Sequence, residues 1–308
     1  MIVTVTPNPS IDRTLRIGRL ERGGVVRVSS VTDEAGGKGL NVSRALAQDG
    51  HTTVAVLPMP ERTEAMFVDL VGGDATLEAV PVCGAMRVNI SLVEDDGTVT
   101  KINEAGPTLD EAAAARLLDR AVGSAAGADW VVGCGSLPPG MAPGFYGLLA
   151  ASVPPRVRVA VDASGPALAA AAEAGVALLK PNRTELEELT GRSLLTLGAV
   201  ADAAAALLDA GTGAVLTSLG PDGAIYVWPG GAVHAEAGID DVANTVGAGD
   251  ALLAGFLAAG GDADAVVTAV AWGVAACRSP GTRMRPVSDE DVRAVVRHAR
   301  IDRSRRLE

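Results

Sequence analysis

The stretch Asn244-Thr245-Val246-Gly247-Ala248-Gly249-Asp250 leads directly into an apolar run at residues 251–259. The glycines on either side of Ala248 let the backbone turn tightly, and the first N–H groups of the helix that follows lack intrahelical partners. These groups and the helix dipole favour an anion at one spot. Asp250 lies at its rim, where a carboxylate can take a proton from a hydroxyl that attacks a phosphoryl group. A glycine turn with Asp250 as the N-cap of a buried helix is the alternative.

Outward from this loop, short apolar runs alternate with Ala- and Leu-rich stretches at helical period. The runs predict buried strands at residues 2–6, 53–57, 130–132, 157–161, 176–179 and 214–216. The longer stretches predict helices at residues 40–48, 109–126, 199–210, 252–259 and 263–276. Such alternation predicts an α/β fold in which a mostly parallel sheet has helices on both faces.

Residues 12–30 and 86–104 break this alternation and are predicted to form β-hairpins, which turn near Gly23-Gly24 and Asp95-Asp96-Gly97. In the second hairpin, polar and apolar side chains alternate, so that one face carries Val88, Ile90 and Leu92. So thin a sheet does not fold alone. We therefore expect a flap over a site, held partly by another copy of the chain. An antiparallel edge of the main sheet is the alternative.

The composition is that of a globular chain. Of 308 residues, 48% are hydrophobic, and 26 Lys and Arg against 37 Asp and Glu give a net charge of −11. The sequence has no long apolar run and no basic leader, so we expect a cytoplasmic protein without a membrane span. Its three cysteines are far apart, which argues against a disulfide framework or a zinc site.

The acidic charge also bears on the partners. A pI near 4.8 disfavours nucleic acid. The locally basic residues 297–306 are interpreted as a solvated helix end and a frayed terminus. A small phosphorylated ligand can still bind where a few cations gather or where a metal ion intervenes. The three histidines lack metal spacing, and we expect no catalytic triad.

Three further segments could carry chemistry. In residues 180–185, an Asn182 and a Glu185 one helical turn apart could hold water around Mg²⁺, or could simply cap a helix. Residues 218–223 could leave room for a nucleotide or form a β-turn. Lys38, in a glycine-rich loop before a helix, could bind a phosphate or carboxylate, or could be an exposed lysine. Neither a Walker loop nor a Rossmann fingerprint is present.

The motifs together resemble the ribokinase-like, or PfkB, family of small-molecule kinases. The resemblance covers residues 1 to about 285, with G-G-K-G-x-N near residue 36, K-P-N-x-x-E near 180, S-x-G-x-x-G near 218 and T-x-G-A-G-D near 245. The opening residues 6–12, the segment Arg87-Val88-Asn89 and residues 135–140 are similar to the branch of 1-phosphofructokinases and tagatose-6-phosphate kinases. This resemblance implies a doubly wound α/β core and one kinase domain over residues 1–308, with a β lid formed by the two hairpins.

The resemblance also implies roles for individual residues. Asp250 would be the general base, while the backbone of Gly247, Ala248 and Gly249 steadies the transferred phosphoryl group. Residues implied to bind ATP are Lys180, Asn182, Ser218, Gly220 and Gly223. Mg²⁺ would be held through water by Asn182 and Glu185. Residues implied to bind the sugar hydroxyls are Asp12, Gly37, Lys38 and Asn41. The substrate's own phosphate would lie against Lys38, Arg87 and Asn89.

Two departures from the family pattern stand out. Pro58 and Pro60 occupy a segment where the family carries a glycine-rich loop, which implies a stiffer loop here. Asn244 stands where Asp, Ser or Thr is usual, but it can still make turn hydrogen bonds.

The resulting expectation is a kinase that uses ATP and Mg²⁺ on fructose 1-phosphate and forms a homodimer through its lids. Tagatose 6-phosphate or fructose 6-phosphate is the close alternative. A nucleoside or unphosphorylated-sugar kinase, or a sugar-phosphate sensor without turnover, is the more distant one.

Overall fold

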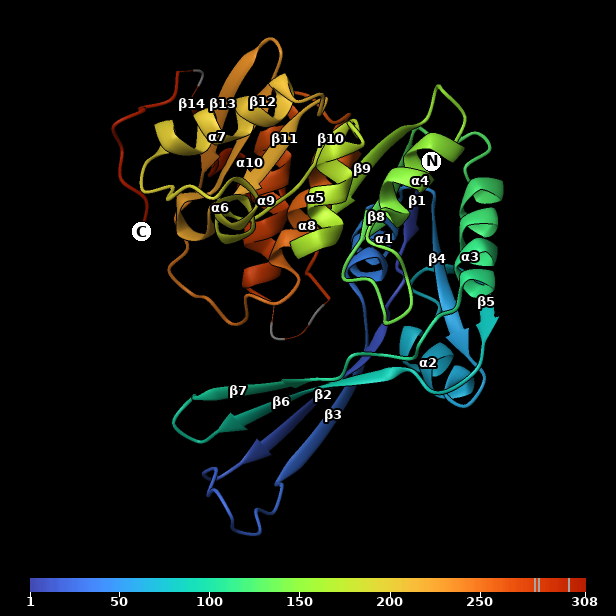
Figure 1. The fold of residues 1–308 in the computed structure, drawn as a ribbon. Helices are drawn as coiled ribbons and strands as arrows, with labels where there is room; N and C mark the ends of the chain where they lie inside the picture. Colours follow the sequence, from blue (N-terminus) through green and yellow to red (C-terminus); the bar gives the residue numbers. More distant parts are fainter. Residues whose placement is uncertain (280, 282, 299) are drawn as a thin grey trace.

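The protein, described by a computed structural model over residues 1–279, 281, 283–298 and 300–308, has a main body and a projecting arm (Figure 1). Within this described part, the body is built on a ten-stranded sheet. In spatial order its strands are β14 (Val296–His298), β13 (Gly231–Glu236), β12 (Ala224–Trp228), β11 (Val215–Ser218), β10 (Leu178–Leu179), β9 (Arg158–Asp162), β8 (Trp130–Cys134), β1 (Ile2–Val5), β4 (Thr53–Pro60) and β5 (Thr76–Val82).

From β11 to β5 all neighbouring strands run parallel, and β12, β13 and β14 add an antiparallel edge. The chain passes from β1 outward to β4 and β5 and then returns to β8 on the other side of β1. This reversal is the winding of a doubly wound sheet. The predicted α/β class, with a doubly wound and mostly parallel sheet, is confirmed.

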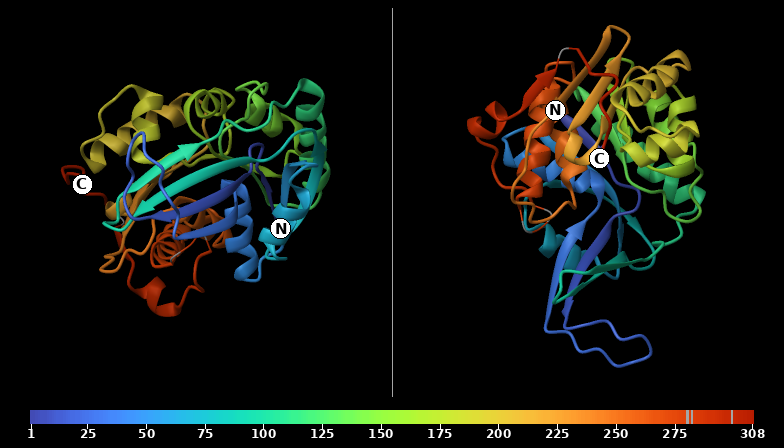
Figure 2. Two further views of the ribbon diagram at one scale, coloured as in Figure 1. Left: turned by 90° about the horizontal axis from the view of Figure 1, so that it is seen from below. Right: turned by 90° about the vertical axis from the view of Figure 1, so that its left-hand side faces the viewer.

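Helices cover both faces of the sheet (Figure 2). On one face lie α1 (Lys38–Gln48), α8 (Ala248–Ala258) and α9 (Ala265–Cys277). The other face carries α3 (Glu111–Ser124), α4 (Phe145–Ser152), α5 (Gly165–Glu173), α6 (Arg183–Thr190) and α7 (Leu197–Asp209). Alternation along β1 explains this arrangement, because Ile2 packs into the first core and Val3 and Val5 pack into the second. The body also contains α2 (Glu64–Val71), η1 (Gly220–Asp222) and α10 (Asp289–Arg293).

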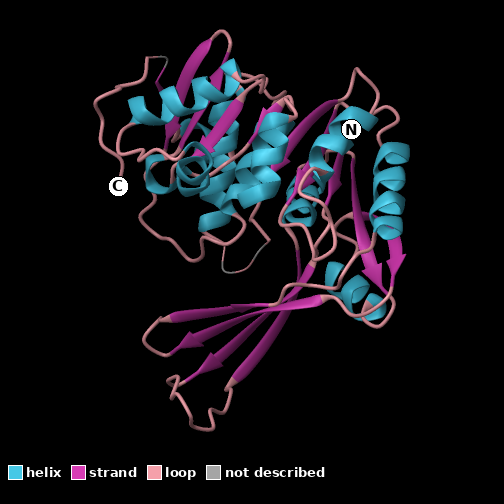
Figure 3. Ribbon diagram, viewed as in Figure 1, coloured by secondary structure: helices cyan, strands magenta, loops and turns pink. Residues whose placement is uncertain are grey.

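The arm is a separate four-stranded sheet in the order β3 (Ser30–Gly36), β2 (Ser10–Ile17), β6 (Arg87–Glu94) and β7 (Val99–Asn103). Each predicted hairpin is present, and the two join through a parallel pairing of β2 with β6. The arm is therefore not an edge of the main sheet, and Figure 3 shows it as strands and their connections. Because successive side chains alternate, Asp12, Arg87 and Asn89 share one face and Ile90 and Leu92 share the other.

Two details of the sequence interpretation were wrong. The sequence predicts the first hairpin over residues 12–30, but β2 pairs with residues 30–36, so most of the predicted second strand, including the 86% exposed Val25, belongs to the connection between β2 and β3. Pro58 and Pro60 lie in β4 rather than in a loop. β1 pairs only with residues 53–56 of β4, so beyond residue 56 this side of β4 has no neighbouring strand in the described part of the chain. A proline is tolerated there, because the N–H group that it lacks would have no partner to bond.

The C-terminal segment also differs from its predicted frayed state. Residues 296–298 form β14 against β13, and Ile301 and Leu307 pack against the core beneath α7. The segment is held because its apolar residues bury surface there. Among the described residues, no helix is both long enough and apolar enough to cross a membrane.

Candidate active site

The polar side chains gather where neighbouring parallel strands end. Asp162 is the last residue of β9, Lys180 follows β10, and Ser218 ends β11. Since ligands of doubly wound folds bind at the carboxyl ends of the strands, this edge is the expected place for a site. A cavity of about 360 Å³ opens here between the body and the arm. It is lined by Ser10, Asp12, Gly37, Lys38, Asn41, Arg87, Asn89, Asp162, Lys180, Asn182, Ser218, Val246, Gly247, Gly249 and Asp250.

Asp250 lies in the first turn of α8 and is buried. The N-cap is Gly247, whose φ of 82° is left-handed, and Asp250 does not cap the helix. Its Oδ2 instead accepts a hydrogen bond of 2.8 Å from Nδ2 of Asn41, on α1. Asn244 makes the expected turn bond, since its Oδ1 accepts from the N–H of Val246 at 3.0 Å. The loop therefore leaves the Asp250 carboxylate free for chemistry.

The surroundings of Asp250 bring the pKa of its carboxyl group close to neutral pH. Burial raises its pKa to about 7, and the nearby Asp162 carboxylate adds to this effect. Lys38, the Asn41 amide and Lys180 act in the opposite direction. A general base is most effective when its pKa is close to the working pH.

This environment predicts a pH dependence. The Asp250 carboxylate accepts a proton only when it is ionised, so kcat/KM should fall as the pH drops through about 7. Well below that value, the decline should approach about tenfold per pH unit. The measurement is kcat/KM against pH under conditions where circular dichroism shows the fold intact. A profile that stays flat through this range would contradict the assignment of Asp250 as the base.

Asp162, which sequence reasoning did not single out, organises the cations of the site. Its Oδ1 accepts a hydrogen bond of 2.7 Å from Nζ of Lys38, and its Oδ2 lies 3.1 Å from Nζ of Lys180. Burial opposes the charge of Lys38, but Asp162, Asp250 and Glu185 outweigh it and raise the lysine pKa. Burial likewise opposes the charge of Asp162, but the two lysines keep its pKa below the ordinary value. The sequence did contain one signal for this residue, because Asp162 directly follows the buried strand predicted at residues 157–161.

The polar face of the arm completes the cavity. Asn89 Nδ2 donates to Asp12 Oδ1 at 2.9 Å, so β6 and β2 present this pair together. Arg87 is half-buried and donates to the backbone carbonyls of Asn8 and Glu104. Within the described residues, its guanidinium forms no ion pair within 4 Å, and the Asp12 carboxylate attracts it only from a greater distance.

Several cavity residues carry acceptors that no donor of the described residues satisfies. Asn41 Oδ1, Asn89 Oδ1 and Asp162 Oδ2 are buried and lack hydrogen-bond partners, although Lys180 attracts Asp162 electrostatically. Leaving such atoms unpaired costs free energy. A polyhydroxylated ligand could satisfy the two amide oxygens through its hydroxyl groups.

A second cavity of about 650 Å³ meets the first at Asn182, Ser218 and Gly249. Polar groups line it at this end, and the rest of its lining includes the apolar side chains of Ile239, Val242, Val270, Val274 and Cys277. The predicted nucleotide-binding residues Gly220 and Gly223 and the loop residue Ala248 line it too. This lining suits a small molecule that has a flat apolar ring at one end and a polar tail at the other.

Asn182 and Glu185 form a capping box on α6. The Asn182 side chain accepts from Glu185 N, and the Glu185 carboxylate accepts from Asn182 N, both at 2.8 Å. The helix-cap alternative is therefore realised. Glu185 Oε1 nevertheless lies 3.8 Å from Lys38 Nζ, so this carboxylate also belongs to the charge cluster around Asp162.

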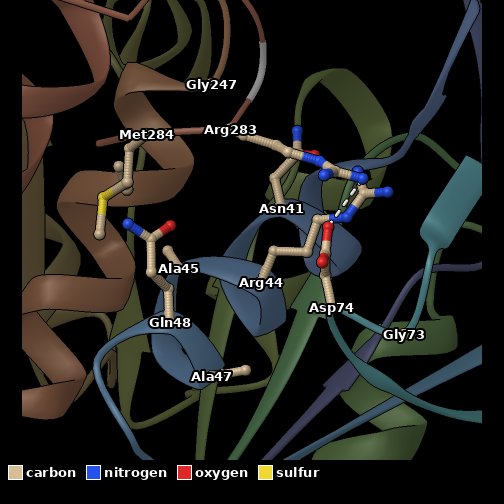
Figure 4. Close-up of a pocket in the computed structure, with 11 residues that line it drawn as sticks. Asn41, Arg44, Ala45, Ala47, Gln48, Gly73, Asp74, Gly247, Arg283 and Met284 are labelled. Carbon is tan, nitrogen blue, oxygen red and sulfur yellow. Dashed lines mark ion pairs between the residues drawn. The ribbon is translucent and has the colours of Figure 1, made fainter. Parts of the chain in front are cut away.

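A third cavity, of about 500 Å³, lies behind Asn41 and Gly247 (Figure 4). Arg44, which lines this cavity, donates hydrogen bonds to the carbonyls of Ala35 and Leu70. Arg283 forms an ion pair with Asp74 at 2.8 Å. Both arginines reach the Leu70 carbonyl at the end of α2. These contacts fasten the base of the arm and α2 to α1, which carries Asn41.

A buried carboxylate that accepts a proton near neutral pH, placed where a polar cavity and an apolar cavity meet at a helix N-terminus, is suited to moving a phosphoryl group between two small molecules. Fold and site thus define the class of small-molecule kinases.

Comparison with known proteins gives the family. The model of the pfkB family of carbohydrate kinases matches residues 6–287, and the chain belongs to this family. It is 37% identical to the 1-phosphofructokinase of Rhodobacter capsulatus over 83% of this chain and 82% of that protein. The identity to the 1-phosphofructokinase of Haloferax volcanii is 35%, over 94% and 95%. A structure of Escherichia coli phosphofructokinase-2 with fructose-6-phosphate superposes with a TM-score of 0.83 and 28% identity, covering 95% of this chain and 96% of that one.

Proposed function

We propose that the protein transfers the γ-phosphoryl group of ATP to the 6-hydroxyl of fructose 1-phosphate. The observation that carries the proposal is Arg87, a half-buried cation that forms no ion pair with any described carboxylate and lies in the cavity that also holds Asp250. A phosphate already on the sugar supplies the missing anion. Relatives named 1-phosphofructokinase support fructose 1-phosphate over other sugar phosphates.

The sugar phosphate is proposed to bind between the arm and the body. Its phosphate lies against Arg87, Asn89 and Lys38, and its hydroxyls meet Asp12, Asn41 and the backbone at Gly37. In a protein of net charge −11, such a local group of cations is what draws in an anionic substrate. The arm acts as the lid of a single kinase domain over residues 1–308, and its closure excludes water from the reacting groups.

For the transfer itself, Asp250 takes the proton of the attacking hydroxyl. The N–H groups at Gly247, Ala248 and Gly249 lie at the start of α8, where they stabilise the negative charge of the phosphoryl group. We assign the nucleotide to the second cavity, with its phosphates near Lys180, Asn182 and Ser218 and the loop at Gly220 and Gly223 beside it.

The donor set fits Mg²⁺. This ion prefers carboxylate and amide oxygens and keeps several waters. The Oδ2 of Asp162 is buried and has the Lys180 ammonium, at 3.1 Å, as its ion-pair partner, and Asn182 and Glu185 lie beside the same charge cluster. Asn182 and Glu185 would hold the ion through water, with Asp162 next to them. When bound, Mg²⁺ neutralises charge on the ATP phosphates.

Arg87→Ala should separate the two substrates. The change removes a charge-assisted bond to the sugar phosphate only, so KM for fructose 1-phosphate should rise by about 10-fold to 100-fold while KM for ATP changes little. Initial rates with each substrate varied in turn measure this difference. Arg13→Ala is the matched control, because Arg13 lies on the same sheet but pairs with Asp33 at 2.7 Å. Equal increases in both KM values would overturn the assignment of the phosphate site.

The outer face of the arm supports a homodimer joined through the lids. Val31, Ile102 and their neighbours Ile90 and Leu92 form an apolar face that is partly exposed; Val31 is 52% and Ile102 is 51% exposed. We propose that the same face of a second copy of the chain packs against it in a homodimer. Light scattering should give twice 31.0 kDa at micromolar concentration. Ile102→Glu should give a monomer, and Val25→Glu, in the exposed connection, should not. A monomeric native protein would refute the proposal.

The position of the new phosphate tests the proposed function. Phosphorus NMR of the product made from fructose 1-phosphate and MgATP should show phosphate at both ends of the hexose. An unchanged sugar phosphate, with ATP hydrolysed or untouched, would count against it.

A further inference from the structure

The C-terminal residues 302–308 lie along the outside of the proposed nucleotide cavity. Backbone bonds attach them to the start of α7: Leu197 N donates to the Arg305 carbonyl at 3.0 Å, and Leu307 N donates to the Leu195 carbonyl at 3.1 Å. Arg183, on α6, donates to the carbonyl of Glu308 at 2.6 Å. Arg183 and Glu308 both line the cavity, so this segment forms part of its wall.

Arg305 joins two other walls of that cavity. Its Nη2 donates to Oδ1 of Asp222 at 2.9 Å, and its Nη1 donates to Oε1 of Glu236 at 2.7 Å. Asp222 belongs to η1, whose neighbours Gly220 and Gly223 line the cavity, and Glu236 ends β13 directly before the lining residues 237–239. One guanidinium therefore bridges the loop and the neighbouring segment, both of which line the cavity.

The contact is built into the loop. The Asp222 side chain is only 4% exposed, and its Oδ2 accepts from the backbone N–H of Glu308 at 2.8 Å. Its carbonyl accepts from Nε2 of His234 at 2.7 Å. The hydrogen bond from Arg305 holds the pKa of Glu236 at about 2, despite partial burial, so Glu236 stays charged. Without Arg305, Asp222 would be a buried carboxylate that keeps one weaker partner.

The loop also has little freedom to settle elsewhere. Gly223 adopts φ +78°, and a Cβ there would clash with the Ala235 carbonyl of β13. The loop thus lies directly on β13, and the hydrogen bond from Arg305 to the Asp222 side chain is a second attachment.

We propose that Arg305 is a positioning residue for nucleotide binding, which holds the loop at Gly220–Asp222 and the segment after Glu236 at the spacing that the nucleotide requires. This inference rests on the proposed kinase function. Arg305 acts through Asp222 and Glu236, and contacts neither substrate.

The test is the dissociation constant of MgATP, measured by calorimetry on the full chain. Arg305→Ala should raise this constant about tenfold, because the variant lacks the charge-assisted hydrogen bonds to Asp222 and Glu236 that hold the cavity wall in place. KM for the sugar phosphate should change less than twofold. Arg303→Ala is the matched control, since Arg303 lies in the same segment and pairs with exposed Asp202 at 2.7 Å, away from the cavity. Arg305→Lys should give an intermediate affinity, because lysine keeps the positive charge but lacks the planar guanidinium that bonds two carboxylates at once.

The outcomes separate the two proposals. If the native chain fails to bind MgATP, the kinase function itself fails. If the native chain binds MgATP and Arg305→Ala binds it equally well, only the positioning role is overturned. Should Arg305→Ala not fold, as judged by thermal melting, Arg305→Lys and Glu236→Gln replace it. Both should then bind MgATP more weakly than Arg303→Ala, and equal affinities would reject the role.

Discussion

Replacing Asp250 by alanine is expected to lower kcat by a factor of about 10² to 10⁴, the usual contribution of a general base. The hydroxyl of the acceptor would then have to lose its proton without the one buried carboxylate that lies at the start of α8. Asn41, which donates to this carboxylate, cannot replace it, because an amide does not accept a proton at neutral pH.

Affinity for MgATP should change little in the same variant, since Asp250 lines the first cavity and is not among the residues that line the second one. Initial rates and a binding isotherm on Asp250→Ala separate the two quantities. Asp264→Ala is a suitable control, because Asp264 is exposed and pairs with Arg297 at the start of α9. Unchanged turnover would remove Asp250 from the mechanism.

Of the substitutions proposed for this protein, Asp162→Ala should lower the free energy of unfolding the most. Its carboxylate faces two lysines, and the Lys180 side chain is only 3% exposed. Removing one partner of a buried ion pair leaves an uncompensated charge, which typically costs about 3–5 kcal/mol of unfolding free energy. We expect a loss near the lower end, because the Lys38 side chain is 37% exposed and water can reach it.

Chemical denaturation of the variant measures this loss. Asp129→Ala is the matched control: Asp129 also makes an ion pair of 2.7 Å, with the N-terminal ammonium, but is 71% exposed. Its loss should be less than about 1 kcal/mol. Equal losses for the two variants would contradict the view that Asp162 is the electrostatic centre of the site.

Local patterns were sufficient to pick out many of the residues that line the two cavities of the candidate site. The loop at Gly247–Gly249 and the capping pair Asn182 and Glu185 are short-range features, so their residue types and spacing are visible in the sequence. The alternation in β6 likewise placed Arg87 and Asn89 on one face. Long amphipathic helices such as α3 and α7 were also predicted, because their apolar stripe repeats over several turns.

Features that depend on tertiary contacts could not be predicted. The role of Asp162 arises only when β9 and β10 pair and α1 brings Lys38 alongside. Short helices such as α4 and α5 are apolar almost all round and show no stripe. The bridge made by Arg305 joins residues more than sixty positions apart in the chain, which no local pattern reveals.

The most direct test of the central claim is initial-rate phosphorylation with MgATP as donor. The acceptors to compare are fructose 1-phosphate, tagatose 6-phosphate, fructose 6-phosphate and unphosphorylated fructose, with Asp250→Ala as the blank. We predict a strong preference for fructose 1-phosphate, and rates with Asp250→Ala close to background. Turnover of unphosphorylated sugars alone would contradict the substrate assignment, and no turnover of any acceptor would favour a sensor that binds sugar phosphates.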